Sequence, residues 1–140
     1  VIAAVHGYAI GGGCELMLMA DYVVAAHDTK FGQPELKLGF IPGCGATQRL
    51  KSRVGYGNAL NLIASANIES FELADRISDK NSFLNVACDI ATEWCKQGRM
   101  ELINLKSAMR GNFQTERQIF YEMVVSDKAQ NLIQQFLSKS

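Results

Sequence analysis

The stretch IGGGCEL, residues 10–16, places three glycines and a carboxylate between two apolar runs. Residues 1–5 (VIAAV) form a short continuous apolar run, which is typical of a strand buried on both faces. Residues 15–20 (ELMLMA) are rich in strong helix formers. The glycines therefore predict a turn from strand to helix, and we expect the helix to begin near Gly12 or Gly13.

The order of elements around this turn is unusually tight. Residues 22–26 (YVVAA) again have the composition of a strand, so strand, helix and strand fit into the first 26 residues. An ordinary crossover between parallel strands takes roughly 30 residues or more. We therefore expect an α/β fold whose sheet is not a standard doubly wound one.

Turn and helix signals follow in regular order. Pro34 is placed to be the first residue of a short helical segment, and residues 40–45 (FIPGCG) form a second glycine-rich turn. Residues 46–54 predict a helix that Gly55 closes. Beyond it we predict helices over three segments: 83–95, 100–110 and 115–137, the last with a break at Ser126. We divide the chain into a core segment, residues 1–65, and a helical region, residues 66–140.

The composition narrows the possible partners. The 140 residues suffice for one domain, 48% are hydrophobic, and 14 basic residues balance 14 acidic ones. This balance disfavours nucleic acid or an anionic membrane as a partner. The four cysteines lack Cys-x-x-Cys spacing, which favours free thiols over disulfides or zinc and a reducing compartment: the cytoplasm, or alternatively the mitochondrial matrix. Without a starting methionine, the chain has the appearance of the downstream part of a longer one.

The glycine turn could serve chemistry or only geometry. Amide N–H groups in the first turn of a helix have no partner inside the helix, and they suit an oxyanion. The alternative is a tight structural turn. A dinucleotide site is less favoured because neither glycine cluster completes the Gly-x-Gly-x-x-Gly pattern.

Two acids stand in apolar surroundings. Glu15 is followed by four apolar residues, which predicts a helix buried all round; Glu35 follows the second strand-like run and a proline. A buried glutamate can transfer protons, whereas a solvated one at a helix start is only structural. His6 and His27 have the positions of core or edge histidines. A nucleophilic pair of His6 and Cys14 would lack a third, orienting residue.

Three stretches together resemble one family: VIAAVHGYAIGGGCEL at 1–16, FGQPE at 31–35 and GFIPGCGATQRL at 39–50. They are similar to the central segment of enoyl-CoA hydratases of the crotonase superfamily, densely over residues 1–65 and loosely beyond. The resemblance implies the C-terminal part of a crotonase-like ββα spiral core followed by a helical trimerisation region. It also implies a homo-oligomer, a trimer or a dimer of trimers, that binds acyl-CoA.

The resemblance also implies roles for four residues. The Gly12 backbone amide would be one of two donors to the thioester oxyanion, and the Gly43 backbone would line the same site. Glu15 and Glu35 would hold a water molecule, with Glu15 as base and Glu35 as acid, and add it in syn fashion to a trans-2-enoyl-CoA. No metal and no separate cofactor are implied, since coenzyme A is part of the substrate.

The chain departs from the family pattern in two ways. The upstream half, with the second oxyanion donor, is absent from these residues. The family's Gly-Leu-Val segment and its short strand are missing or replaced, because the chain passes through residues 76–81 (RISDKN) directly into a helix. Two alternatives stay open: a superfamily isomerase or decarboxylase, and a non-catalytic acyl-CoA-binding or assembly module.

Overall fold

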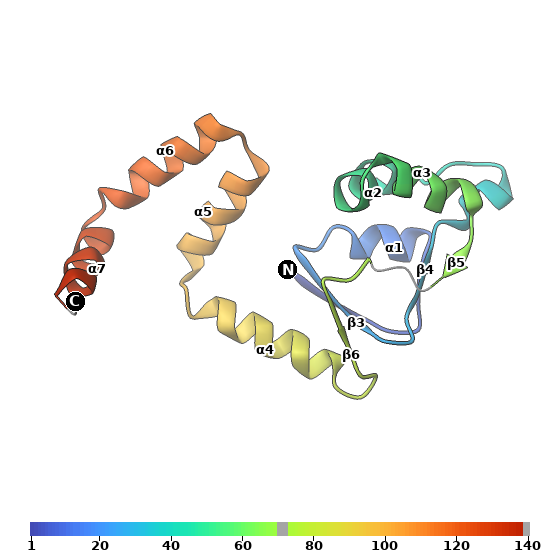
Figure 1. Cartoon of the computed structure of the whole chain (residues 1–140), viewed down its shortest axis with the longest axis horizontal. Coiled ribbons are helices and arrows are strands. Elements are labelled where there is room, and N and C mark those ends of the chain that lie inside the picture. Colours follow the sequence, from blue (N-terminus) through green and yellow to red (C-terminus); the bar gives the residue numbers. More distant parts are fainter. Residues whose placement is uncertain (70–72, 139–140) are drawn as a thin grey trace. The chain divides into compact units, whose positions relative to one another are not determined.

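The computed structural model describes residues 1–69 and 73–138, and the chain forms two compact units, Val1–Thr92 and Glu93–Ser140 (Figure 1). The division falls later in the chain than residue 65, where the sequence segments were divided. The physical reason is that two short strands beyond residue 65 pair with strands of the first unit.

Within the described residues, the first unit holds two small sheets of three strands each. Their strands are β1 (Ile2–Val5), β2 (Tyr8–Ile10), β3 (Tyr22–Ala26), β4 (Lys30–Gly32), β5 (Ile68–Glu69) and β6 (Arg76–Ser78). The first sheet has the order β1-β3-β6 and is parallel throughout. The second has the order β2-β4-β5, in which β5 is antiparallel to β4.

The chain alternates between the two sheets. Gly7, with φ of 67°, turns it from β1 into β2, and the short helix α1 (Gly12–Met17) follows. β3, β4 and the 3-10 helix η1 (Pro34–Leu38) then repeat the order strand, strand, helix. Parallel pairing of β1 with β3 and of β2 with β4 stacks the two ββα turns, so the prediction that the sheet is not doubly wound is confirmed.

Gly11 is the position where the strand-to-helix turn requires glycine. Its φ is 52°, and its N–H donates to the Gly32 carbonyl at 2.9 Å. A Cβ on Gly11 would lie 2.9 Å from Oε1 of Glu35. Both the left-handed conformation and the close approach of the carboxylate therefore exclude a side chain. The predicted helix start is confirmed at Gly12.

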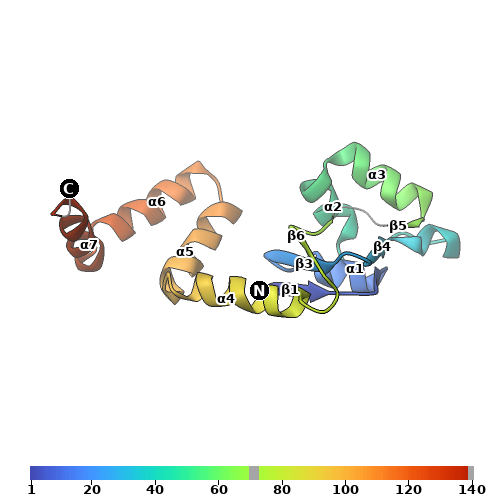
Figure 2. The ribbon, with the colours of Figure 1, turned by 60° about the horizontal axis from the view of Figure 1, so that its bottom comes forward.

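The remaining helices of the first unit begin and end where local signals indicate. Pro34 opens η1, and α2 (Ala46–Val54) ends at Gly55, whose φ is 80°. The helix α3 (Tyr56–Ser65) follows at once and packs against α2, as Figure 2 shows. The helix α4 (Phe83–Cys95) starts in the first unit.

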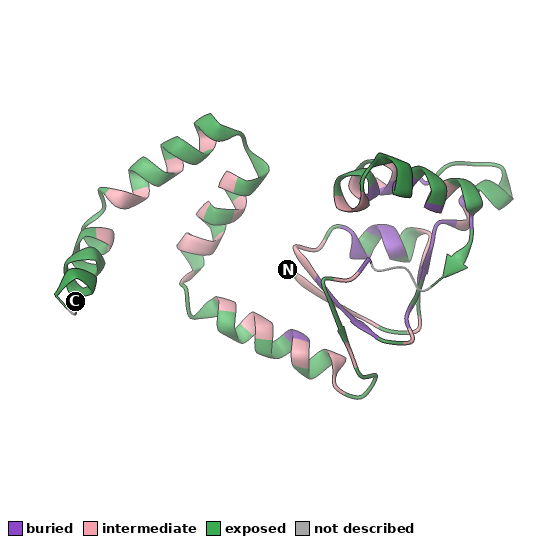
Figure 3. Ribbon diagram, in the orientation of Figure 1, coloured by how far each residue is buried: buried purple, intermediate pink, exposed green. Residues whose placement is uncertain are grey.

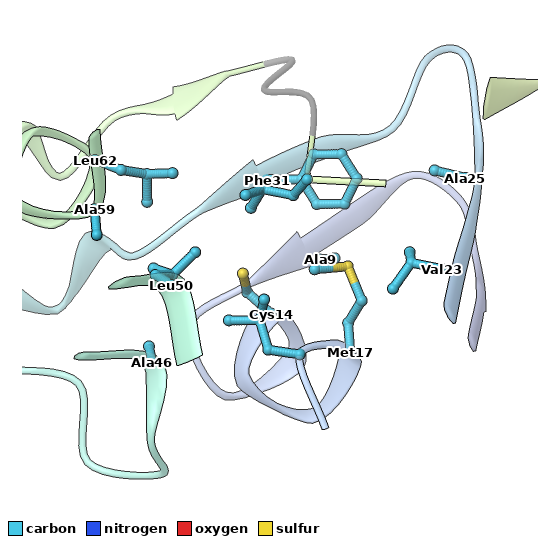
Figure 4. Packing of buried hydrophobic residues seen from close by; sticks show 12 residues of the cluster. Ala9, Cys14, Met17, Val23, Ala25, Phe31, Ala46, Leu50, Ala59 and Leu62 are labelled. Atoms are coloured by element: carbon cyan, nitrogen blue, oxygen red, sulfur yellow. The ribbon is translucent and has the colours of Figure 1, made fainter. Parts of the chain in front are cut away.

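A single cluster of apolar side chains fills the space between α1, β3, β4, α2 and α3 (Figure 4). Its largest fully buried members are Phe31, Leu50, Leu62, Leu73 and Val23. Burying a side chain of this size contributes about 1.5–3 kcal/mol. This cluster therefore fixes α2, and with it the turn of residues 43–46, against α1.

Two predictions about burial are wrong. β1 is half-buried rather than buried on both faces. The stretch after Glu15 is not buried all round, because Leu16 of α1 is 70% exposed and Met19, beyond the end of the helix, is 47% exposed. The helix ends at Met17 and presents only one face, with Cys14 and Met17, to the core.

The prediction that residues 76–81 lead directly into a helix is also wrong. Arg76–Ser78 form β6, whose Arg76 pairs with Val24 of β3. Asp75 ties the start of this strand to β3, because its Oδ2 accepts from the Val23 N–H at 2.8 Å. A short strand, which the family resemblance led us to consider missing or replaced, is thus present at Arg76–Ser78.

The second unit contains α5 (Arg99–Arg110), α6 (Phe113–Val124) and α7 (Asp127–Leu137). The predicted break is confirmed, since Ser126 is the N-cap of α7 and its hydroxyl accepts from the Ala129 N–H at 3.3 Å. None of the three helices has a buried residue over its described length (Figure 3). Along residues 1–69 and 73–138, no helix combines the length and the apolar character that crossing a membrane requires.

Gly32 offers a test of this packing. In Gly32→Ala, the new Cβ would lie 2.6 Å from the Asn67 carbonyl oxygen and 3.1 Å from Cα of Ile68. Because both contacts are backbone, we expect the free energy of unfolding to fall by about 2 kcal/mol. Urea denaturation measures it.

Gly57→Ala is the matched control. Gly57 lies in α3, and nothing is within 4 Å of its Cβ position. This variant should keep the stability or raise it by up to about 1 kcal/mol. Equal stability of the Gly32→Ala variant and the native protein would contradict the close approach of β4 and β5.

Candidate active site

Glu15 is a buried carboxylate anchored by backbone amides. It lies on α1 and is 2% exposed. Its Oε1 accepts from the Cys44 N–H at 2.7 Å and from the Ala46 N–H at 3.0 Å. Both donors belong to the second glycine turn. These bonds fix Oε1, whereas Oε2 has no hydrogen-bond partner among the described residues and can accept from a ligand or water.

Glu35 is the second buried carboxylate, at 8% exposure. It lies in the first turn of η1, directly after Pro34. With the Gln33 amide nitrogen directed at Glu35, that nitrogen donates to Oε1 at 3.2 Å and to Oε2 at 3.1 Å. The Glu35 Oε1 also lies against the backbone of Gly11.

The structure brings the four residues singled out by the sequence together around the start of α1. Gly12 is the first residue of this helix, and Glu15 lies one turn on. Glu35 reaches the same point through its contact with Gly11. Gly43 immediately precedes Cys44, whose amide binds Glu15.

The backbone at this point is open to a ligand. Gly12 and Gly43 are exposed, and nothing lies within 4 Å of the Cβ position of either one or of Gly13. The first amide N–H groups of a helix have no acceptor within the helix. The Cβ sides of Gly12 and Gly43 are thus unobstructed, and the Gly12 amide is one of the N–H groups that a ligand could use.

Cys14 takes no part as a nucleophile. It is fully buried, and burial raises the pKa of its thiol to about 11. The carboxylates of Glu15 and Glu35 both add to this rise, which places them near the sulfur. At neutral pH the thiol is therefore protonated, so the hypothesis of a nucleophilic pair with His6 is wrong.

The histidines also differ from expectation. His6 is exposed, and its ring packs against Phe83 with a centroid separation of 5.3 Å. His27 is exposed at the end of β3, where its backbone N–H donates to the Ser78 carbonyl at 2.9 Å. Neither is a core histidine; His6 follows β1, an edge strand of its sheet, so the edge position applies to His6, whereas β3 before His27 is the central strand.

Sequence reasoning missed Gln33. It is fully buried, and its amide nitrogen donates to both carboxylate oxygens of Glu35. The available signal was a polar side chain at the end of a strand-like run, two residues before an acid. The backbone donors of Cys44 and Ala46 were missed as well, because the sequence does not show which amides meet a carboxylate.

Other parts of the described chain hold no comparable cluster. No group of three or more His, Cys, Asp or Glu residues there is placed to bind a metal ion. A hollow of about 370 Å³ beside α2 is lined by Gln48, Arg49, Ser52 and Arg53 together with Leu18, and includes neither acid. A larger one, of about 540 Å³, lies within the second unit. We therefore take the region around Glu15, Glu35 and Gly12 as the candidate site in preference to either hollow, because it offers carboxylates and backbone amides to a ligand.

Comparisons with known proteins point to one family. The family model described as enoyl-CoA hydratase/isomerase matches residues 1–140. A "Probable enoyl-CoA hydratase" of Mycobacterium leprae is 36% identical over 99% of this chain and 60% of its own length. The "Short-chain-enoyl-CoA hydratase" of Clostridium acetobutylicum is 43% identical over 66% of this chain and 38% of its own. A crystal structure of enoyl-CoA hydratase subunit I from Geobacillus kaustophilus superposes with a TM-score of 0.91 at 31% identity, covering 99% of this chain and 59% of that one.

The chain therefore belongs to the enoyl-CoA hydratase/isomerase family. Its stacked ββα turns and terminal helices form the corresponding part of the crotonase fold, as the resemblance implied. The chain spans 60% of the length of the Mycobacterium leprae relative that it matches end to end.

The state of the four thiols gives a direct test of the site's burial. Cys44, Cys88 and Cys95 are exposed, whereas Cys14 is buried with its pKa raised to about 11. At pH 8 we expect iodoacetamide to leave Cys14 unmodified in the folded protein, as read by peptide mass spectrometry. In urea, all four should react. Rapid native alkylation of Cys14 would contradict the described environment.

Proposed function

We propose that this chain carries the acid–base part of an enoyl-CoA hydratase site, and that the protein adds water to trans-2-enoyl-CoA thioesters. The observation that carries the proposal is the placement of two buried carboxylates, Glu15 and Glu35, beside the open amide of Gly12. Family membership supports the same chemistry. The substrate is acyl-CoA, and no separate cofactor takes part.

Charge develops on the thioester oxygen in this reaction. The water oxygen forms a bond to the β-carbon, and the electron pair of the double bond moves to the thioester carbonyl, which becomes an enolate. The Gly12 N–H donates to that oxygen, and Gly43 lines the site with its backbone. One preorganised donor of this kind contributes about 3–4 kcal/mol to lowering the barrier. The second donor belongs to the part of the family's sequence upstream of these residues.

The two carboxylates divide the proton transfers. Glu15, held through Oε1 by two amides, accepts the water proton on Oε2. Glu35 in its protonated form delivers a proton to the α-carbon as the enolate collapses. Both protons are handled from the same side of the substrate, which gives syn addition.

The presence of both acids favours a hydratase over the family's isomerases and decarboxylases, which act through the same oxyanion site. Product analysis separates them, because a hydratase forms a 3-hydroxyacyl-CoA. A non-catalytic acyl-CoA-binding or assembly module would bind the thioester without turnover. Four free thiols further support a reducing compartment, the cytoplasm or the mitochondrial matrix.

Replacing either acid tests the proposal. In Glu15→Gln and Glu35→Gln, the amide keeps the shape of the side chain and an accepting oxygen, but it cannot act as an acid or a base at neutral pH. We expect the kcat for hydration of crotonyl-CoA to fall by about 100-fold or more in each variant. The loss of the conjugated enoyl-thioester absorbance measures it.

Glu116→Gln is the matched control, since Glu116 is an exposed acid in the first turn of α6. It should keep full activity. A loss of less than tenfold in the Glu15 variant, with the protein folded, would contradict the assigned roles.

The second unit supports self-association, and we propose that the protein forms a trimer or a dimer of trimers through it. Its helices leave large apolar side chains in water: Phe113 is 83% exposed, Met109 78% and Phe136 73%. Exposed apolar surface of this kind marks interaction sites.

Phe113→Asp tests this surface. Phe113 opens α6, where an acidic side chain suits the helix dipole, so the fold should persist. We expect sedimentation velocity to show a lower oligomeric mass for this variant, because a charge is buried without a partner. Gln114→Asp, which adds the same charge to an exposed position of the helix, should keep the native mass. A monomeric native protein would contradict the proposal.

A further inference from the structure

The turn whose amides bind Glu15 is also bound by Arg49, a residue to which the proposed reaction gives no role. Arg49 lies on α2, one helical turn after Gly45. Its guanidinium Nη1 donates to the Cys44 carbonyl at 2.8 Å, and its backbone N–H donates to the Gly45 carbonyl at 2.9 Å. Arg49 therefore binds both carbonyls that lie between the two N–H groups that hold Glu15.

The grip on Glu15 depends on the orientation of one peptide unit. Oε1 of Glu15 accepts from the N–H groups of Cys44 and Ala46, and the peptide that joins Cys44 to Gly45 lies between these two donors. This middle peptide carries neither donor. Its orientation decides whether the N–H groups on either side converge on one oxygen, as they do in the backbone concavities that bind anions. The Arg49 guanidinium binds this peptide through its carbonyl oxygen.

Gly45 explains why the middle peptide needs a partner. Its φ is 105°, in the left-handed region, and a Cβ at this position would overlap Nη1 of Arg49. Glycine is therefore required for the guanidinium to reach the Cys44 carbonyl. Glycine also adopts positive and negative φ with similar ease, so the adjoining peptide can rotate when nothing holds it. A hydrogen bond from a charged guanidinium is stronger than one between neutral groups, and it removes this freedom.

The second arginine of α2 has a different contact. Nε of Arg53 donates to the Leu73 carbonyl at 2.7 Å, and its Nη2 forms an ion pair with Asp75, also at 2.7 Å. Arg53 thus ties the end of α2 to the segment that leads into β6. Arg49 is half-buried and binds only within its own turn and helix. Replacing Arg49 therefore leaves the tie between α2 and this segment in place.

We infer that Arg49 is a positioning residue for Glu15. Its guanidinium fixes the peptide between Cys44 and Gly45, so that both flanking amides hold Oε1 and leave Oε2 for the water molecule. The effect on catalysis rests on the proposed hydratase function, in which Glu15 is the base. The positioning itself is a property of the folded chain and can be measured separately.

Kinetics of Arg49→Met test the catalytic consequence. Methionine removes the charge and every donor but keeps a straight side chain of high helix propensity. Lys51→Met is the matched control, because it removes the same charge from an exposed position of α2. We expect kcat for crotonyl-CoA hydration to fall about tenfold in Arg49→Met, with KM changed by less than about twofold, since Arg49 acts through Glu15. Lys51→Met should keep the native kcat. An unchanged kcat in Arg49→Met, or an equal loss in both variants, would overturn the inference.

Amide hydrogen exchange tests the positioning without relying on activity. Labelling with ¹⁵N-cysteine gives one backbone signal for each of the four cysteines, and Cys44 is assigned by its absence in Cys44→Ser. In Arg49→Met, the Cys44 amide should exchange about tenfold faster, because its acceptor Glu15 is held less firmly. Cys88, within α4, is the internal control and should keep its rate. Lys51→Met should change neither rate.

The two readouts separate this inference from the proposed function. Equal exchange of the Cys44 amide in the native protein and in Arg49→Met would overturn the inference even if hydration is observed. An equal acceleration of Cys88 would overturn it too, because the whole unit would then have lost stability. Selective acceleration of Cys44 would support the positioning role even if the native protein does not hydrate crotonyl-CoA, in which case only the hydratase proposal fails.

Discussion

The two hydrogen bonds from Cys44 and Ala46 to Glu15 are the interaction on which the first unit depends. A carboxylate that is almost fully buried needs hydrogen-bond donors, and these two amides supply them to Oε1. The bonds join α1 to the turn that leads into α2. Leu50 of α2 then lies in the core beside Cys14 and the other apolar side chains (Figure 4). The turn that binds Glu15 therefore also positions α2 in the core.

Two glycines allow close packing around the site, one beside Glu35 and one between β4 and β5. Gly11 leaves room for Oε1 of Glu35, and Gly32 leaves room for the backbone of residues 67 and 68. A side chain at Gly11 would push η1 away from α1, and one at Gly32 would push β5 away from β4. The stacked ββα turns bring acids separated by twenty residues in sequence to one helix start.

Local signals predicted part of the fold well. Gly55 and Ser126 act on their own helix ends, so α2 and the break before α7 were found from sequence. The strands β2, β4, β5 and β6 have two or three residues each and exist only through pairing, which no local pattern shows. Glu15 and Glu35 were singled out from their apolar surroundings, and their roles came from the family resemblance. Gln33 was missed because the sequence does not show which group its buried amide meets. The apolar run after Glu15 led to the wrong prediction of a helix buried all round, because a short helix buries only one face.

The central claim is that two acids on one side of the substrate add the elements of water together. Hydration of crotonyl-CoA by the protein in D₂O, followed by proton NMR of the 3-hydroxybutyryl-CoA product, tests it most directly. The account predicts one deuterium at the α-carbon, on the same face as the new hydroxyl group. Deuterium on the opposite face, or random labelling of both α-positions, would contradict the arrangement of Glu15 and Glu35 described above.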